Sequence, residues 1–416
     1  MQYFLENETA GRLQEVTMEQ SFWQKLQRVK AKDIGNIFVF ILALPVAAVY
    51  KRKRKDLWLI CDNENEARDN GYWLFKYIRD HHKEQDVMYA INKKSPDYAR
   101  VKDLGPVVQY GSFMHWVYYL TASKNISSQK EGKPNAAVCY LFEVYGILKN
   151  TRVFLQHGII KDDLDFLHYK NTKMRLFMCS TQREYEYVNA QYGYPKGWVQ
   201  KPGLCRYDNL FDTSQGKRQI LVMPTWRNWI SIPTTESYAQ EDITEFTGTK
   251  YFQCWNEFLC DKVLAEFLEK ENIRLVFYPH RGMQKFIKSF QSLSPHIVIA
   301  KWPEYDVQEL LKESNLLVTD YSSIAMDFAY LKKPLLYYQF DYEMFRKGQY
   351  SEGYFSYKDD GFGKVCEKEQ DVVAEIERIT HSGMIMPDLY QQRVDEFFSY
   401  RDRDNCERNY EAICKL

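Results

Sequence analysis

From Asp56 onwards the sequence alternates between short apolar runs and longer stretches with helical periodicity. Val87–Ile91 has the composition of a buried strand, and Gln182–Gln191 has the pattern of the helices that follow such strands. Alternation of this kind is typical of βαβ units, in which helices cover both faces of a parallel sheet. The sequence therefore predicts an α/β fold.

The alternation is interrupted once, and this interruption divides the chain in two. Glycine and proline gather at Gly193–Gly197 and Lys201–Gly203, and the alternation restarts after Arg218. A chain of 416 residues is long enough for two domains of about 200 residues each. We expect doubly wound domains over 56–200 and 201–380, facing a cleft, with a membrane-associating segment over 1–55 and a helical tail over 381–416. The default ligand site of such a pair is the cleft at the carboxyl ends of the strands.

One stretch of the second half predicts a strand that runs directly into a helix. Leu316–Thr319 is apolar or β-branched, and helical periodicity begins a few residues later, with Ser322 or Ser323 suited to the N-cap position. The free N–H groups and the dipole of such a helix start favour a phosphate. We expect Ser322 and Ser323 to hold the diphosphate of an activated donor. Asp320 either accepts from a ribose, positions a histidine, or only caps the strand end.

Two histidines follow other predicted strands. His157 comes after Val153–Leu155 and precedes a glycine, so its imidazole can enter the cleft where the backbone turns. His280 and Arg281 follow Ile273–Tyr278 and offer two donors to an anionic group. The alternatives are a structural histidine at a turn, a capping histidine and a surface arginine.

Further basic and polar candidates lie in two loops. Thr225 and Arg227 follow the predicted strand Ile220–Met223, where the hydroxyl can donate to a phosphate and the guanidinium is cationic at any pH. An exposed loop arginine is the alternative. Arg206 lies in the connection between the halves.

The chain has no Walker loop, no GxGxxG, no HExxH and no Gly-x-Ser-x-Gly motif. Residues 252–270 read as one long helix.

Composition excludes several classes of function. The net charge is zero, so the protein as a whole is not built to bind nucleic acid. The nine cysteines include no CxxC pair and suit core thiols of a reducing compartment. Asp162 and Asp163 lack the rest of a ligand set, so no metal site and no cofactor is predicted.

The N-terminal region combines an apolar run with a basic one. Residues 1–11 show no cleavable signal, residues 12–32 could form a helix, and Ile37–Tyr50 is uncharged and apolar. Fourteen helical residues reach about 21 Å, short of the ~30 Å hydrocarbon core, and Pro45 shortens the regular part further. We expect a monotopic element held on anionic lipid by a basic run. The alternatives are a buried core helix beside a solvated charge run, or a single span. The basic run consists of Lys51, Arg52, Lys53, Arg54 and Lys55.

In their order along the chain, these motifs resemble the CDP-glycerol glycerophosphotransferase family, the TagB/TagF-like enzymes that build teichoic acids and some capsule polymers. The resemblance covers about residues 57–380. It rests on Glu66–Gly71, Ser127-Ser128, His157-Gly158, Gly203-x-x-Arg206-x-Asp208, Pro224–Arg227, Pro279-His280, Thr319–Ser323, Asp327–Ala329 and Lys333-Pro334.

The resemblance implies a GT-B fold and a transferase of the EC 2.7.8 type at the cytoplasmic face of a bacterial membrane. Its expected partners are CDP-glycerol, a lipid-linked saccharide acceptor and the anionic membrane surface. His157 corresponds to the family's proposed base, and His280 to a second histidine that contacts the donor phosphates. The positions expected to bind the donor are Arg206, Thr225, Arg227, Arg281, Asp320, Ser322 and Ser323.

Three departures from the family pattern keep alternatives open. Ile159–Lys161 replaces the common Thr-Pro-Leu-Lys on what we expect to be the acceptor side, Cys205 replaces a proline, and Arg281 replaces another. The acceptor, and the choice between single addition and polymerisation, therefore stay open. The rival functions are a CDP-ribitol-dependent transferase, another GT-B nucleotide-sugar transferase, and a non-catalytic membrane adaptor.

Overall fold

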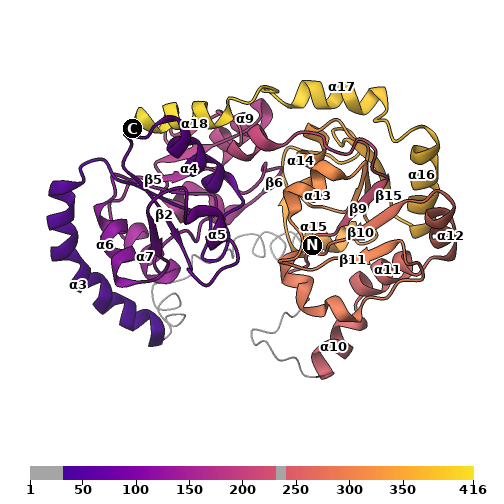
Figure 1. Ribbon diagram of the computed structural model, residues 1–416, viewed down its shortest axis with the longest axis horizontal. Coiled ribbons are helices and arrows are strands. Elements are labelled where there is room, and N and C mark those ends of the chain that lie inside the picture. Colours follow the sequence, from indigo (N-terminus) through magenta and orange to yellow (C-terminus); the bar gives the residue numbers. More distant parts are fainter. Residues whose placement is uncertain (1–30, 231–239) are drawn as a thin grey trace, which may run out of the picture.

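The computed structural model describes residues 31–230 and 240–416. Two parallel sheets, one from each half of the chain, form two α/β domains that lie side by side (Figure 1). The α/β fold is as predicted, and the boundary expected near residue 200 falls between the last strand of one sheet and the first of the other. The helix expected over residues 12–32 lies outside the described residues, except for its last two positions.

The first sheet has the order β3-β2-β1-β4-β5-β7-β8, and every pairing in it is parallel. This is the doubly wound order, in which the direction of winding reverses between β1 and β4. Its strands are β1 (Trp58–Cys61), β2 (Val87–Ile91), β3 (Val107–Gln109), β4 (Lys124–Ser127), β5 (Arg152–Phe154), β7 (Leu176–Met178) and β8 (Val199–Gln200).

The second sheet repeats this winding as β11-β10-β9-β12-β13-β15 and is also wholly parallel. Successive residues of β9 point into different cores: Ile220 and Val222 into one, Leu221 into the other. Apolar layers therefore cover both faces. Its strands are β9 (Gln219–Met223), β10 (Arg274–Phe277), β11 (Ile297–Ile299), β12 (Leu316–Thr319), β13 (Leu335–Tyr338) and β15 (Gly363–Cys366).

Side-chain caps begin several helices of the first domain. Asp69 caps α4, and Ser112 caps α6 by accepting from the His115 N–H at 3.1 Å. The helices of this half are α4 (Asn70–His81), α5 (Tyr98–Val101), α6 (Phe113–Thr121), α7 (Ala136–Val144), the 3₁₀ turn η1 (Asp165–Leu167), α8 (Tyr169–Thr172) and α9 (Gln182–Gln191).

The long helix expected over residues 252–270 is wrong, because the structure has two helices there. Asp261 interrupts the apolar periodicity and caps the second helix by accepting from the Leu264 N–H at 2.6 Å. The helical elements of this half are η2 (Cys205–Asn209), α10 (Gln240–Thr247), α11 (Lys250–Leu259), α12 (Lys262–Lys270), η3 (Arg281–Ser289), α13 (Val307–Glu313), α14 (Ile324–Tyr330), α15 (Tyr342–Gly348), α16 (Glu369–His381) and α17 (Asp388–Phe397).

The chain ends by returning to the first domain. After α17 on the second domain, α18 (Asn405–Cys414) packs against α4 and η2 (Figure 1). Asp208 fixes its start by accepting from the backbone N–H groups of Asn405 at 2.9 Å and Cys406 at 2.7 Å. A short antiparallel pair, β6 (Asp162–Asp163) with β14 (Ser351–Glu352), also joins the two halves.

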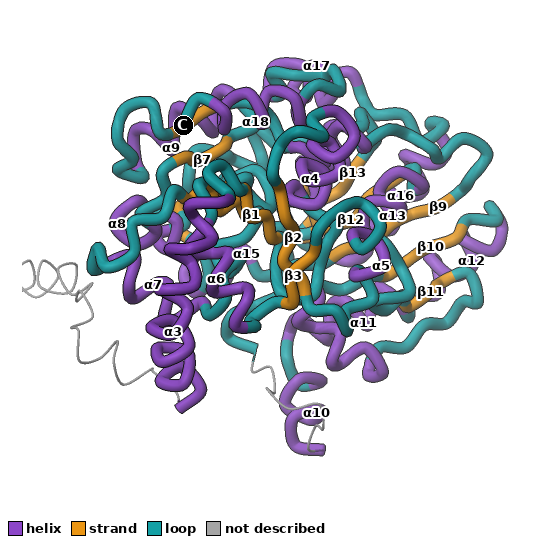
Figure 2. Tube along the Cα trace, turned by 60° about the vertical axis from the view of Figure 1, so that its left-hand side comes forward, coloured by secondary structure: helices purple, strands orange, loops and turns teal. Residues whose placement is uncertain are grey.

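The N-terminal apolar run forms one helix, α3 (Ala31–Lys53), which continues through Pro45. The expected shortening at Pro45 is wrong, because Pro45 lies on the exposed face while Phe40, Ala43 and Ala47 pack the other face onto the domain. Figures 1 and 2 place α3 along α6 and α7. Its 23 residues reach about 34 Å. Among the described residues, it is the one helix apolar and long enough to span a membrane.

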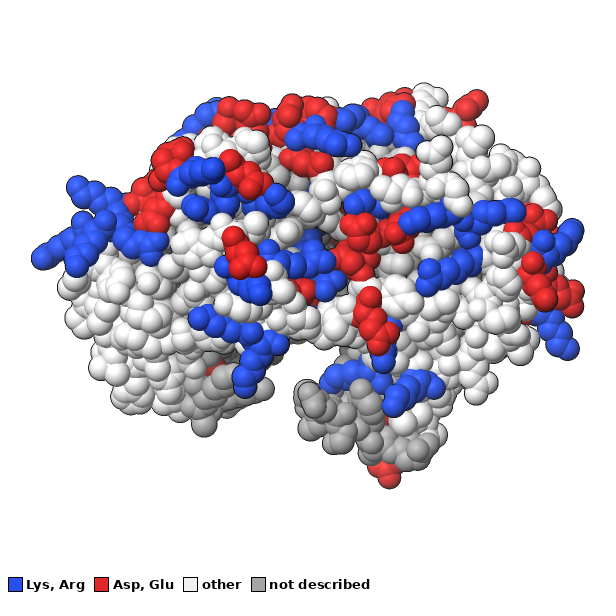
Figure 3. Space-filling model, in the orientation of Figure 1, with Lys and Arg blue, Asp and Glu red and all other residues white. Residues whose placement is uncertain are grey.

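The structure shows that α3 is not a buried core helix. Only 22% of its apolar window is buried, and Phe38 and Leu42 are each 64% exposed. Within the basic run, Arg54 forms an ion pair with Asp86, to which its Nε donates at 2.7 Å. The other members are exposed, and Lys and Arg gather at this end of the molecule in Figure 3.

Candidate functional site

Three loops of the second domain meet at the carboxyl edge of its sheet. Pro224–Arg227 follows β9, Pro279–Arg281 follows β10, and Asp320–Ser323 follows β12. Because β9 lies between β10 and β12 in a parallel sheet, the loops are direct neighbours at the point where the winding reverses. The structure therefore brings together motifs that the sequence separates by up to about one hundred residues.

The loop that carries His157 faces them from the first domain. It follows β5 and reaches the turn after β12: a Cβ atom placed on Gly158 would lie 2.8 Å from the Ser323 hydroxyl oxygen. Only glycine allows this approach without displacing Ser323. His157 and the Ser322–Ser323 turn are thus adjacent across the domain boundary.

His157 is held by one carboxylate and is otherwise accessible. Its Nδ1 lies 2.5 Å from Asp69 Oδ2, and its side chain is 67% exposed. A carboxylate accepts, so Nδ1 carries the proton and the Nε2 lone pair is free. The charge of Asp69 raises the pKa of His157 above its ordinary value, against the opposing effect of the protein that surrounds the cleft. This is the arrangement of a general base.

Sequence reasoning missed Asp69, although it lies within the Glu66–Gly71 stretch that contributed to the resemblance. Its carboxylate is buried and also accepts from Arg206 Nη1 at 2.8 Å and from the Asn70 N–H at 2.8 Å. Its own N–H donates to Asp62 Oδ2 at 3.0 Å. Burial, followed by the charge of Asp69, raises the pKa of Asp62 to about 6.

The His157 loop is also fixed from below by Glu184 of α9, a second residue that the sequence did not reveal. Glu184 is fully buried and accepts from the backbone N–H groups of Ile160 at 2.6 Å and Ser180 at 2.7 Å, and from Gln156 Nε2 at 3.0 Å. Gln156 itself has a positive φ of 66°. Residues on both sides of His157 are therefore fastened to one carboxylate, whose pKa burial raises to about 7.

His280 presents the opposite tautomer. Its Nδ1 accepts from the Gly282 N–H at 3.1 Å, which places the proton on Nε2 when the ring is neutral. The His280 side chain is accessible to solvent, but nearby protein atoms remove part of the water around its imidazole. This desolvation, followed by the charge on His157, lowers the pKa of His280 to about 4. His280 is thus a neutral hydrogen-bond donor close enough to His157 to feel its charge.

Arg206 ties the two domains together beside these groups. Its Nη1 donates to Asp69 at 2.8 Å and to the His157 carbonyl at 2.5 Å, while its Nη2 donates to both oxygens of Asp327 at 2.9 and 2.8 Å. Asp327 lies on α14, directly after the Ser322–Ser323 turn. In this structure the Arg206 guanidinium is engaged in internal ion pairs, and its contact with a donor stays a prediction.

Arg227 and Asp320 are engaged in a buried ion pair rather than open to solvent. Both are 0% exposed, and Arg227 Nη1 lies 2.9 Å from Asp320 Oδ2 while its Nε lies 2.8 Å from Asp341. Asp320 Oδ1 accepts from the Thr225 N–H at 2.8 Å. These buried charges pin the β9 and β12 loops to each other, and the expected contact of the two side chains with a donor stays a prediction.

Arg281 reaches across the domain boundary. Its guanidinium pairs with Glu66 of the first domain and lies 4.1 Å from the centroid of the Trp302 ring. The chain therefore has an interdomain ion pair next to His280. Arg281 is 40% exposed and stays at the site.

Thr225, Ser322 and Ser323 retain the capacity to bind a ligand. Within the described residues, the buried Thr225 Oγ1 has no hydrogen-bond partner. Ser323 is the N-cap residue of α14 but makes no side-chain capping bond, and Ser322 Oγ accepts weakly from the Ile324 N–H at 3.4 Å. The expected serine cap is therefore weak, which leaves the hydroxyls available as donors.

The replaced segment Ile159–Lys161, which we expect to border the acceptor side, is buried within the protein. All three residues are buried, Ile159 packs into a core of the second domain, and Lys161 pairs with Asp162. This departure from the family pattern is accommodated by packing between the domains. Asp162 also pairs with Arg346 at 2.6 Å.

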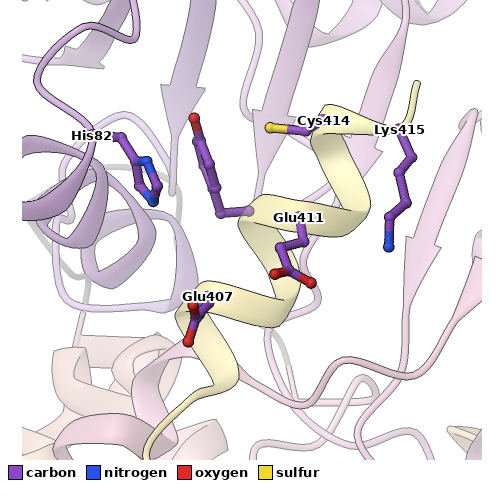
Figure 4. A pocket seen from close by; sticks show the side chains of 6 residues that line it. His82, Glu407, Glu411, Cys414 and Lys415 are labelled. Atoms are coloured by element: carbon purple, nitrogen blue, oxygen red, sulfur yellow. The ribbon is translucent and has the colours of Figure 1, made fainter.

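Two further features of the described ranges, 31–230 and 240–416, lie outside this cluster. No group of three or more His, Cys, Asp or Glu side chains there could hold a metal ion. A groove of about 540 Å³ lies between the end of α4 and α18 (Figure 4). Since Asp69 caps the other end of α4, the groove is a helix length away from His157. Its lining residues are His82, Glu407, Tyr410, Glu411, Cys414 and Lys415.

Comparison with known proteins finds a family model and relatives that cover most of the chain. Residues 42–415 match the family model described as CDP-Glycerol:Poly(glycerophosphate) glycerophosphotransferase. The minor teichoic acid biosynthesis protein GgaB of Bacillus subtilis (strain 168) is 34% identical over 371 residues, which are 87% of this chain and 40% of GgaB. This chain thus spans less than half of that relative.

Two more distant relatives agree. The teichoic acid poly(glycerol phosphate) polymerase of Bacillus spizizenii is 22% identical over 312 residues, 66% of this chain and 71% of that protein. The structure of the wall teichoic acid polymerase TagF superposes with a TM-score of 0.62 at 15% identity, covering 93% of this chain and 97% of that one. At this identity the likeness establishes the fold, which is of the GT-B type.

Proposed function

Because the chain belongs to the CDP-Glycerol:Poly(glycerophosphate) glycerophosphotransferase family, we propose that it transfers glycerol phosphate from CDP-glycerol to a hydroxyl group. The acceptor is a membrane lipid-linked saccharide or a growing polymer, and CMP is released. The product belongs to a teichoic acid or capsular polysaccharide. This assignment covers the donor, the bond that is formed and the class of acceptor.

The two histidines suit the two demands of this reaction. The acceptor oxygen attacks the glycerol-bearing phosphorus, a new P–O bond forms, and the bond from that phosphorus to the CMP oxygen breaks. Nε2 of His157 takes the acceptor proton and later returns it to solvent. Phosphoryl transfer requires mainly positioning and charge stabilisation. His280 Nε2–H and the hydroxyls of Thr225, Ser322 and Ser323 supply hydrogen bonds to the phosphates.

A single observation carries the proposal: the approach of Gly158 to Ser323. It brings the backbone next to His157 against the turn that we expect to hold the diphosphate. This closeness supports a base and a phosphate seat that come from different domains and act on one reacting group. A membrane adaptor that only kept the fold would have no need of this alignment.

The decisive experiment is a donor panel with the purified protein, an acceptor extract and CDP-glycerol, CDP-ribitol or UDP-sugars, read as released CMP or UDP. We expect CMP release from CDP-glycerol. His157→Ala should lower turnover by about 10²–10⁴ while donor binding stays nearly unchanged, since a lost general base has effects of this size.

The matched control is His296→Ala, which removes a histidine that directly precedes β11, at the opposite edge of the sheet. It should keep the turnover of the parent protein. Unchanged turnover in His157→Ala would refute the role of His157. Nucleotide release from CDP-ribitol or a UDP-sugar alone would mean that this compound, and not CDP-glycerol, is the donor. No nucleotide release from any donor would favour a non-catalytic membrane adaptor.

We also propose that the protein lies on the cytoplasmic face of the bacterial membrane through α3. The exposed apolar residues of α3 continue onto neighbouring elements of the first domain, where Phe113 is 41% and Ile147 60% exposed. A basic end beside an apolar face is typical of a helix that rests in the interfacial region of an anionic leaflet. This attachment would bring the first domain, which carries His157, to a lipid-linked acceptor.

A further inference from the structure

Asp69 divides its two carboxylate oxygens between two tasks. Oδ1 accepts from the Asn70 N–H and from Arg206, bonds that fix the start of α4 and the connection between the domains. Oδ2 accepts from His157 Nδ1 at 2.5 Å. The first set of bonds explains the fold, whereas the second is directed at a side chain that is 67% exposed. A solvent-accessible imidazole contributes little to packing, so the second bond needs another explanation.

We propose that Asp69 is a positioning residue of the transfer reaction, which holds His157 with Nδ1–H toward its own carboxylate and Nε2 toward the acceptor. This inference rests on the proposed function. It goes beyond it by assigning the group that selects the tautomer and the ring orientation of the base. A neutral imidazole in water exchanges between two tautomers, and only the one with the free Nε2 can take a proton from the cleft.

The carboxylate is itself rigid, which a positioning residue requires. Asp69 is buried at the N-terminus of a 12-residue helix, where the free N–H groups and the helix dipole favour a negative charge. Behind it, Asp62 accepts from the N–H groups of Asp69 at 3.0 Å, Gly71 at 2.8 Å and Tyr72 at 3.2 Å. A Cβ on Gly71 would lie 2.4 Å from Asp62 Oδ1, so the cap is closely packed.

Arg206 extends this alignment to the second domain. The same guanidinium that holds Asp69 also binds the His157 carbonyl and, through Nη2, Asp327 of α14. The ring, its carboxylate and the helix behind the Ser322–Ser323 turn are therefore connected by consecutive hydrogen bonds. Alignment of His157 is thus linked to closure of the two domains around the donor turn.

The charged groups that face His157 allow the sign of the pH effect to be worked out. Asp69 and Asp327 favour the protonated ring, Arg206 disfavours it, and His280 is neutral above about pH 4. Asp62 acts only through Asp69. Because the base works unprotonated, activity should fall as the pH drops through a His157 pKa above 6.5. This decline is the acid limb of the pH–activity profile, and removal of the Asp69 charge should move it to lower pH.

The test is Asp69→Asn in the full chain, with three readouts. We expect turnover to fall by about 10²–10⁴, since the asparagine amide donates where the carboxylate accepted and favours the wrong tautomer. The acid limb of the kcat/KM profile should shift to lower pH. In ¹⁵N NMR of the imidazoles, assigned by the signal lost in His157→Ala, the His157 pKa should fall and its proton should move from Nδ1 to Nε2.

Asp69→Glu should restore part of the activity and of the acid limb, because the carboxylate charge returns. The matched control is Asp261→Asn, which changes another N-cap aspartate, that of α12, far from the cleft. It should leave the acid limb and the His157 resonances unchanged. Folded Asp69→Asn protein with the acid limb and tautomer of the parent would overturn the proposal.

The parent protein alone provides a test that needs no variant to fold. In the absence of donor, its His157 should titrate above 6.5 and carry its proton on Nδ1 at higher pH. A proton on Nε2, or a pKa below 6.5, overturns the role of Asp69 even if CMP is released normally. Conversely, a correct tautomer without release from any donor would overturn the proposed function and leave the pairing intact.

Discussion

At the scale of single residues, the two histidines of the cleft are chemically different although both are imidazoles. The carboxylate at Nδ1 of His157 raises the pKa of that ring. At His280 a backbone N–H at Nδ1 leaves the proton on Nε2, and desolvation, followed by the charge on His157, lowers the pKa to about 4. Environments that push the pKa values of two titratable groups apart in this way assign the acid, base and donor roles of a site to different residues. The order of the histidines in the chain does not reveal this difference; their hydrogen-bond partners do.

This difference predicts distinct pH profiles for the two histidine variants. His280→Ala should lower kcat by about 10²–10³, the usual effect of removing one preorganised donor to a developing charge. Since His280 is already neutral above about pH 4, its removal should not move the acid limb set by His157. His280→Asn, which keeps an N–H donor, should recover part of the loss. An acid limb displaced in His280→Ala would show that His280 titrates in the working range.

The sequence revealed the candidate residues of the site more readily than the residues that hold them in place. His157, His280 and the serines could be found because each follows a strand whose composition is recognisable. Asp69 precedes His157 by 88 residues and reaches it only in the folded chain, and Glu184 binds the His157 loop from a helix face. Arg227 was recognised as a cation, but its full burial depends on Asp320 and Asp341, which no local pattern reveals.

At the scale of elements, α3 combines one face that packs onto the domain with another that remains apolar and exposed. Local pattern predicted its apolar and basic parts, whereas its unbroken course through Pro45 depends on contacts of the opposite face with α6. Short helices such as α15 were not predicted for a similar reason. Seven residues are too few for intrinsic propensity to fix a helix, so its contacts with neighbouring elements decide.

The structure sharpens the membrane prediction for α3. Replacing Lys51, Arg52, Lys53 and Lys55 with Gln, and keeping Arg54 because it pairs with Asp86, should shift the protein from the membrane to the soluble fraction. At about 1 kcal/mol for each basic residue near an anionic surface, binding to phosphatidylglycerol vesicles should weaken by at least 10²-fold. The effect should be strongest at low salt, where the charges are least screened.

The control for this variant is Lys262→Gln with Lys270→Gln on α12, at the opposite end of the molecule from α3 (Figure 1). It removes exposed lysines of the same kind and should bind vesicles as the parent does. If the α3 variant sediments with anionic vesicles as strongly as the parent, the basic run does not hold the protein on the membrane.

At the scale of the whole molecule, ion pairs join the two domains at more than one place. Asp306 of the second domain accepts from Arg68 at 3.0 Å and Arg100 at 2.5 Å, and Arg346 binds Asp162 at 2.6 Å. The alternation of strands and helices predicted two sheets, but it could not predict these contacts or the return of α18. Both depend on residues far apart in the chain.

Asp306 allows the contribution of domain closure to be measured separately from folding. It caps α13 by accepting from the Gln308 N–H at 2.9 Å, and asparagine preserves an N-cap while removing the charge that Arg68 and Arg100 bind. Asp306→Asn should therefore leave the melting temperature nearly unchanged but populate more open states. Each of the two partly exposed pairs contributes up to about 1 kcal/mol, so the ratio of closed to open molecules should fall by up to about 10–30-fold.

Small-angle scattering should then show a larger radius of gyration for Asp306→Asn, and the donor KM should rise because the phosphate loops of one domain and the His157 loop of the other meet less often. Glu304→Gln is the matched control, since Glu304 pairs at 3.0 Å with Lys301 of its own domain and is exposed. It removes one carboxylate from the same surface without touching the domain contact. An unchanged radius and KM in Asp306→Asn would mean that Arg206 and the β6–β14 pair are sufficient to hold the cleft closed.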